Sequence, residues 1–118
     1  MRIGNCDIEV VAFAPAGLRN SNPVPMDFIP DERAPIVLLH EGLGSTSAWG
    51  AFPSDLAAAS GRTVLAYDRR GYGRSGDWQP PWGVDFLARE TDEVLAPLLT
   101  ELIGRPAVLV GHSDGATI

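Results

Sequence analysis

Short runs of consecutive apolar residues recur along the chain and predict buried β-strands. The runs cover residues 35–39, 63–67 and 107–110, and each ends at a glycine or a polar residue. Uninterrupted apolar runs of this length are typical of strands buried on both faces of a mainly parallel sheet. An earlier segment, residues 8–13, is rich in β-branched and aromatic residues and predicts a further strand. The prolines, glycine and asparagines that follow it indicate a hairpin-like opening.

Two segments between these runs carry the signals of helices. Residues 54–60 follow Pro53, which a first helical turn tolerates, and they end before Gly61. Residues 85–103 predict a helix of about four turns, which we expect Pro97 to kink or divide. The apolar positions of this helix are Leu87, Val94, Leu98 and Leu102, and its polar positions include Glu90, Glu93 and Glu101.

The alternation of strand and helix predicts an α/β fold with a mainly parallel sheet and flanking helices. A polar loop over residues 69–82 joins the second buried strand to the long helix. No repeat, low-complexity tract or linker composition divides the chain, so we expect residues 1–118 to belong to a single domain.

Composition narrows the possible partners and the compartment. The chain has 118 residues and a formal charge of −6, which argues against nucleic acid and anionic membranes as partners. Cys6 is the only cysteine, so the chain has no internal disulfide and no multi-cysteine metal site. Asp7 and Glu9 interrupt the first apolar segment and no signal-peptide core follows. We therefore expect a cytoplasmic protein that needs no metal and no cofactor.

The sequence Gly-His-Ser-Asp-Gly at positions 111–115 follows directly on the last apolar run. In such a turn between strand and helix, the serine adopts a strained backbone conformation, and flanking glycines avoid clashes while the hydroxyl is exposed. Ser113 is therefore a candidate nucleophile, and the N–H of Asp114 is a candidate donor to an oxyanion. The alternative is an ordinary turn whose serine caps a helix.

A second glycine motif, His-Glu-Gly-Leu-Gly-Ser at positions 40–45, follows the run at 35–39. Acyl-transfer enzymes of this architecture place one backbone donor of the oxyanion hole in this loop. Gly42 or Leu43 would supply that N–H, and losing such a donor costs about 3 to 4 kcal/mol of transition-state stabilisation. Alternatively, the glycines serve only the turn.

The segment Tyr67 to Ser75 is the third motif, with the order Asp-Arg-Arg-Gly-Tyr-Gly-Arg-Ser from Asp68. Together the three motifs resemble the α/β-hydrolase superfamily, in which similar segments follow successive strands in this order. The resemblance implies an incomplete α/β-hydrolase fold ending just after the nucleophile elbow, and a structural rather than catalytic loop at Asp68. Glu41 departs from the glycine usual in the family, which leaves open which N–H faces the oxyanion.

The implied function is a serine hydrolase that cleaves a small ester-, thioester- or amide-like substrate through an acyl-enzyme. In the family the triad acid and histidine follow the elbow, so both are expected to be absent from this chain. Neither His40 nor His112 is well placed to replace the missing base. We therefore expect this chain alone to be inactive. Besides a small-molecule substrate, we expect it to bind either a complementing C-terminal chain or a second copy of itself.

Two other interpretations remain open. The chain could be a truncated, noncatalytic α/β-hydrolase-like module that binds a ligand or a partner. More weakly, the glycines at 42 and 44 and the acid Asp68 imitate a dinucleotide-binding Rossmann unit, although Ser47 stands where its third glycine belongs.

Overall fold

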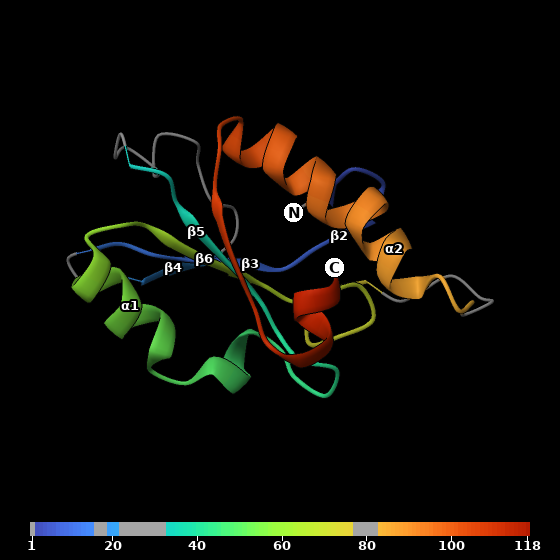
Figure 1. The fold of residues 1–118 in the computed structure, drawn as a ribbon, viewed down its shortest axis with the longest axis horizontal. Coiled ribbons are helices and arrows are strands. Elements are labelled where there is room, and N and C mark those ends of the chain that lie inside the picture. Colours follow the sequence, from blue (N-terminus) through green and yellow to red (C-terminus); the bar gives the residue numbers. More distant parts are fainter. Residues whose placement is uncertain (1, 16–18, 22–32, 77–82) are drawn as a thin grey trace.

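The computed structural model describes residues 2–15, 19–21, 33–76 and 83–118. These residues form three layers, with a central sheet between helices (Figure 1). The helix α1, Phe52–Ser60, covers one face of the sheet, and a helical segment over residues 86–103 covers the other. The predicted α/β class, with a mainly parallel sheet and flanking helices, is confirmed.

The central sheet has five strands in the order β4-β3-β6-β5-β7. The strands are β3 (Val10–Phe13), β4 (Arg19–Ser21), β5 (Ile36–Leu39), β6 (Val64–Tyr67) and β7 (Val108–Gly111). The strand β5 pairs in parallel with both β6 and β7, whereas β3 runs antiparallel to β6 and to β4. All four predicted strands are present, and the β3–β4 pair is the hairpin expected at the opening. Residues 16–18 and 22–32 lie outside the described part of the chain.

A separate two-stranded hairpin precedes the sheet and has no counterpart in the sequence predictions. The strands β1, Arg2–Ile3, and β2, Cys6–Asp7, pair antiparallel across Gly4 and Asn5. Strands of two residues are too short to show an alternating pattern, so the sequence carries no usable signal for them.

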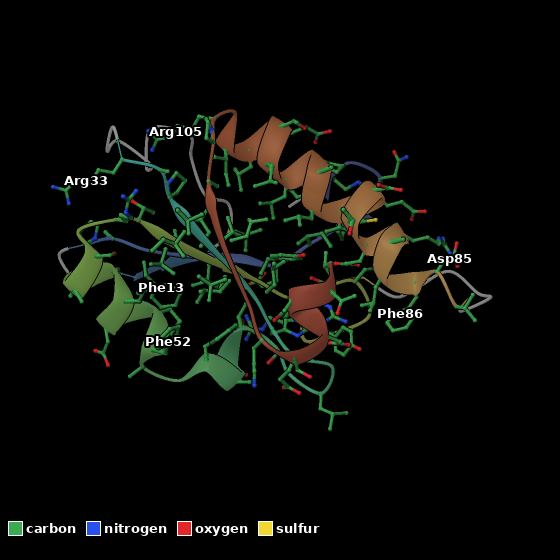
Figure 2. The ribbon with its side chains drawn as sticks, in the orientation of Figure 1. Phe13, Arg33, Phe52, Asp85, Phe86 and Arg105 are labelled. Carbon is green, nitrogen blue, oxygen red and sulfur yellow. The ribbon has the colours of Figure 1, made fainter. Side chains whose placement is uncertain are left out.

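Alternate side chains of the central strands enter opposite cores, as the two-residue period of a strand requires. Val37 and Leu39 pack in the cluster that includes Val94 and Leu98 of the long helical segment. Ile36 and Leu38 belong to the cluster on the α1 side, with Ala57 and Phe13. Figure 2 shows Phe13 and Phe52 on this α1 side of the sheet. Both faces of β5 are therefore buried, which explains its uninterrupted apolar sequence.

The helix α1 matches its prediction closely. It begins two residues earlier than expected, and Pro53 lies in its first turn. Gly61 ends the helix in the left-handed conformation (φ 66°), and its N–H donates to Ala57 O.

The long helical segment comprises α2 (Phe86–Glu90) and the π-helical segments η3 (Thr91–Leu95) and η4 (Leu98–Ile103). A kink or a division was expected at Pro97, but helical backbone continues through this residue (φ −59°, ψ −39°), so the division is wrong. Hydrogen bonds of the π type, such as Ala96 N–H to Thr91 O, span five residues on either side of it. Gly104 ends the segment in the left-handed conformation.

Two further features bear on the site. The strand β7 is the outermost strand, and it pairs only with β5 among the described residues, leaving Val108 and Leu109 each more than 40% exposed. The loop from Arg69 is described as far as Gly76, and residues 77–82 lie outside the described part.

Within the described ranges, no helix has the length and apolarity to cross a membrane.

Candidate functional site

The parallel register brings the three sequence motifs to one edge of the sheet. Leu39 is the register partner of both Tyr67 and Gly111. The chain therefore leaves β5, β6 and β7 at the same level, and the segments that begin at His40, Asp68 and His112 meet there. In open α/β sheets, this carboxyl edge is where ligands bind.

Ser113 lies in a sharp turn between β7 and the 3₁₀-helix η5, Ser113–Thr117. Its φ is 56°, and it is the only non-glycine residue with a positive φ in the described ranges. Left-handed backbone costs a residue with a side chain about 1 to 2 kcal/mol. The strained conformation predicted for this serine is thus present, and the residue is exposed.

The flanking glycines are required by close backbone contacts. A β-carbon on Gly115 would overlap the carbonyl oxygens of Leu39 and His40, at the end of β5. A β-carbon on Gly111 would lie 2.5 Å from Cα of Ala116, in the turn of η5. A side chain at position 115 would force the turn away from the end of β5, and one at position 111 would distort the turn itself.

The loop at residues 40–45 lies directly against the serine turn. A β-carbon on Gly42 would lie 2.9 Å from Oδ2 of Asp114. The Gly42 N–H donates no hydrogen bond within the described ranges. The N–H of Leu43, in contrast, donates to Oε2 of Glu41 at 2.8 Å. The carboxylate of Glu41 therefore occupies one of the two candidate donors in this loop and leaves the other available.

The ring of His40 is buried and both of its nitrogens are hydrogen bonded. Nδ1–H donates to Glu41 O at 2.7 Å, and Nε2 accepts the backbone N–H of Arg69 at 2.9 Å. These partners fix the neutral tautomer, and burial lowers the pKa of His40 below its ordinary value. His40 therefore braces the glycine loop and has no free nitrogen to accept a proton from Ser113.

The other histidine, His112, precedes Ser113 and lies on the exposed side of the turn. Its ring centroid is 6.3 Å from that of Trp49. Within the described part of the chain, neither histidine hydrogen bonds to the Ser113 hydroxyl.

The buried carboxylate of Asp68 holds two loops together. Oδ1 accepts the N–H of Thr46 at 2.6 Å, and Oδ2 accepts the N–H of Arg74 at 2.8 Å. The hydroxyl of Ser75 donates to the Asp68 carbonyl. These contacts support the structural role expected of the Asp68 loop.

The side chain of Asp114 has a partner that the sequence analysis did not identify. Arg69 donates from Nη1 to Oδ1 at 2.8 Å, and from Nη2 to Oδ2 at 3.3 Å. These hydrogen bonds lower the pKa of Asp114 below its ordinary value. The sequence signal for this pair is an acid after the serine and an arginine after Asp68, on two strand ends that the register brings together.

Two cavities are relevant to ligand binding. One, of about 220 Å³, is lined by His40, Glu41, Ala48, Trp49 and His112, and so lies beside the serine turn. A larger one, of about 570 Å³, lies between the β1–β2 hairpin and the long helical segment. It contains no residue of the serine turn or of the loop at 40–45, whereas the smaller cavity is lined by residues of both segments and so adjoins Ser113. No group of three or more His, Cys, Asp or Glu side chains in the described ranges is arranged to hold a metal ion.

Comparison with known proteins identifies one family model and several similar hydrolases. Residues 36–118 match the model of the Alpha/beta hydrolase family. A putative carbamate hydrolase, RutD, of Agrobacterium fabrum is 33% identical over 89 residues, which are 75% of this chain and 32% of that protein. A proline iminopeptidase of Lactiplantibacillus plantarum is 49% identical over 43 residues, which are 36% of this chain and 15% of that protein.

Among solved structures, the thioesterase domain from the curacin biosynthetic pathway superposes with a TM-score of 0.64 at 26% identity. The match covers 98% of this chain and 36% of that one. The chain thus spans about a third or less of the length of these relatives.

Proposed function

Because the chain belongs to the alpha/beta hydrolase family, we propose that the protein carrying it is a serine hydrolase with Ser113 as nucleophile. The proposed substrates are small esters, thioesters or amides, cleaved through an acyl-enzyme. The observation that carries the proposal is the backbone of Ser113. Ser113 has a positive φ and is exposed, at the sheet edge where the Gly42 loop also lies.

In the proposed reaction, Oγ of Ser113 attacks the carbonyl carbon and the carbonyl electron pair moves onto the oxygen. The N–H groups of Gly42 and Asp114 donate to this oxyanion. Gly42 is preferred to Leu43 because the Leu43 N–H is already bonded to Glu41. The N–H of Asp114 belongs to the first turn of η5, where a helix leaves its N–H groups without intrahelical partners. A general base takes the Ser113 proton during the attack and gives it to the leaving group as the bond to that group breaks. Water then attacks the acyl-enzyme, with its proton passing through the same base to Ser113 Oγ, and the acid product leaves.

The reaction needs a general base from outside the described residues, because both nitrogens of His40 are occupied and His112 does not bond to Ser113. We place that histidine, and the acid that orients it, in further polypeptide of the same or a complementing chain. Without a triad member, an acceleration of only about 10³- to 10⁴-fold over water is typical. Residues 1–118 alone are therefore expected to turn over slowly.

The names of the relatives support a carbonyl substrate, since they cover an iminopeptidase, a carbamate hydrolase and a thioesterase. We propose that the cavity of about 220 Å³ beside His112 and Trp49 holds one substituent of that carbonyl. The proposed setting is the cytoplasm, because the single cysteine gives the chain no disulfide to form.

A noncatalytic binding module is the competing proposal. It is favoured by the absence of a hydrogen bond between Ser113 and either histidine in the described part of the chain. A module of this kind would bind ligands at the same edge of the sheet without a serine-dependent reaction.

Labelling with a fluorophosphonate tests the proposal, because this reagent phosphonylates activated serines. The natural protein that carries this chain is expected to be labelled at Ser113 and to hydrolyse an activated ester. Ser113→Ala should abolish both. Ser54→Ala, in α1, is the matched control and should change neither. A protein that is not labelled, or whose turnover survives Ser113→Ala, would support the noncatalytic alternative or another nucleophile.

A further inference from the structure

The guanidinium of Arg69 is buried where the serine turn meets the glycine loop. The residue follows Asp68 at the end of β6 and is only 2% exposed. The guanidinium lies over the ring of Tyr72, with 4.9 Å between Cζ and the ring centroid. A buried arginine that keeps its charge needs hydrogen-bond acceptors close by. The acceptors of Arg69 therefore indicate which groups this side chain stabilises.

Those partners lie on both sides of the proposed oxyanion hole. Nη1 donates to the carbonyl of His40 at 2.9 Å and also to Oδ1 of Asp114 at 2.8 Å. Nη2 completes a two-point contact with Asp114 at 3.3 Å from Oδ2. His40 is two residues from Gly42, and Asp114 directly follows Ser113. One rigid, planar group therefore spans the two segments that carry the proposed donors.

The backbone of Arg69 strengthens the same connection. Its N–H donates to Nε2 of His40 at 2.9 Å, and the opposite nitrogen of that ring holds the carbonyl of Glu41. The carboxylate that Arg69 orients is also the group that lies against Gly42. Displacement of the Arg69 side chain would thus break its hydrogen bonds to the Asp114 carboxylate in the serine turn and to the His40 carbonyl in the glycine loop.

We propose that Arg69 is a positioning residue, which acts through Asp114 and His40 to hold the Gly42 and Asp114 N–H groups at the spacing that an oxyanion requires. This inference rests on the proposed function. Arg69 does not touch the substrate, and it affects the transition state only by fixing the two donors. A misplacement of about 1 Å at such a site costs on the order of 10²-fold in rate.

A lysine cannot substitute for this arginine. The hydrogen bonds to the two carboxylate oxygens and to the carbonyl come from the two terminal nitrogens of one plane, whereas an ammonium is a single point charge. Replacing Asp114 with asparagine keeps its N–H and its size, but it removes the charge and leaves one acceptor oxygen for the guanidinium.

The experiment compares Arg69→Lys, Arg69→Met and Asp114→Asn with the wild type in the natural protein, using an activated ester. The rate is divided by the number of sites that a fluorophosphonate titrates, so that unfolded protein does not count. We expect kcat per titrated site to fall about 10- to 100-fold, while KM changes less than about threefold. Affinity for a boronic acid that forms a tetrahedral adduct with Ser113 should fall in parallel.

Arg62→Met is the matched control, because Nη1 of Arg62 also donates to a backbone carbonyl, that of Ala34, at 2.8 Å. That contact lies at the opposite end of β5 and β6, and its loss should leave kcat unchanged. A kcat within twofold of wild type in Arg69→Met, with turnover that still depends on Ser113, would overturn this inference alone. If Arg69→Met does not fold, an unchanged kcat in Asp114→Asn overturns it. Turnover that survives Ser113→Ala would overturn the proposed function, and this inference with it.

Discussion

The carboxylate of Asp114 fills the space that a side chain on Gly42 would need. Its Oδ2 lies 2.9 Å from the position of a β-carbon on that glycine, and its Oδ1 is held by Arg69. The serine turn and the glycine loop are therefore fitted to each other at this point. Gly42 and Asp114, which carry the two proposed N–H donors, are thus in contact through the Asp114 carboxylate, and Arg69 holds that carboxylate in place.

Gly42→Ala is expected to lower the Ser113-dependent turnover about 10- to 100-fold, because the new methyl group must displace the Asp114 carboxylate or the loop. Gly76→Ala is the matched control, since its β-carbon would meet nothing closer than Asp7 O at 3.5 Å. The measurement is kcat per phosphonate-titrated site. Equal activities of the two variants would show that the contact at Gly42 does not position the site.

Asp68→Asn should destabilise the protein by about 1 to 3 kcal/mol. Its two carboxylate oxygens accept N–H groups from two different loops, at Thr46 and Arg74. Asparagine offers one acceptor, and its amide hydrogens would face the other N–H. Urea denaturation measures the free energy of unfolding, and Asp92→Asn, at an exposed helical position, should change it by less than about 0.5 kcal/mol. A loss no larger than that of the control would mean that solvent replaces these hydrogen bonds.

The features that the sequence predicted are those with a local signal. The strands β5, β6 and β7 are uninterrupted apolar runs, and the turn at Ser113 is marked by two glycines. Both kinds of signal depend on the residues of one short segment. The order of strands and helices predicts parallel strands, and parallel strands place the three motifs that follow them at the same edge of the sheet.

The contacts that escaped prediction join residues far apart in the sequence. Arg69 and Asp114 are separated by 45 positions, and neither residue type signals the other. Glu90 was expected among the polar positions of its helix, but it is only 1% exposed. It is buried because the segment after β6 packs against this part of α2, where the Arg70 N–H lies 3.4 Å from the carboxyl Oε1. A helical period cannot reveal such a partner.

Glu90 is predicted to make stability fall as pH rises from about 4.5 to about 7. Burial raises the pKa of its carboxyl to about 7 in the folded protein, against an ordinary value of 4.5. In this range the unfolded chain releases the proton and the folded protein keeps it, so ionisation favours unfolding. Below about pH 4.5 both states are protonated, and above about pH 7 both are ionised, so the effect is confined to this window.

The Glu90 effect is measured as the difference in unfolding free energy between wild type and Glu90→Gln across pH 4 to 8. Relative to that variant, the wild type should lose about 3 kcal/mol over the window. Asp92→Asn is the control on the same helical segment, at an exposed position. A pH-independent difference between wild type and Glu90→Gln would contradict the raised pKa.

Glycine at position 113 should make the protein more stable than alanine at the same position, by about 1 kcal/mol. Ser113 has a φ of 56°, where a β-carbon is strained and glycine is not. At Ser54, inside α1, the order should reverse, because glycine in a helix is about 1 kcal/mol less stable than alanine. Urea denaturation of Ser113→Gly, Ser113→Ala, Ser54→Gly and Ser54→Ala gives both differences. Opposite signs at the two positions would establish that the strain belongs to the turn, whereas the same sign at both would contradict a strained serine. Neither variant at position 113 has a hydroxyl, so neither should react with a fluorophosphonate there. The difference in unfolding free energy between them therefore measures the backbone strain of the turn alone.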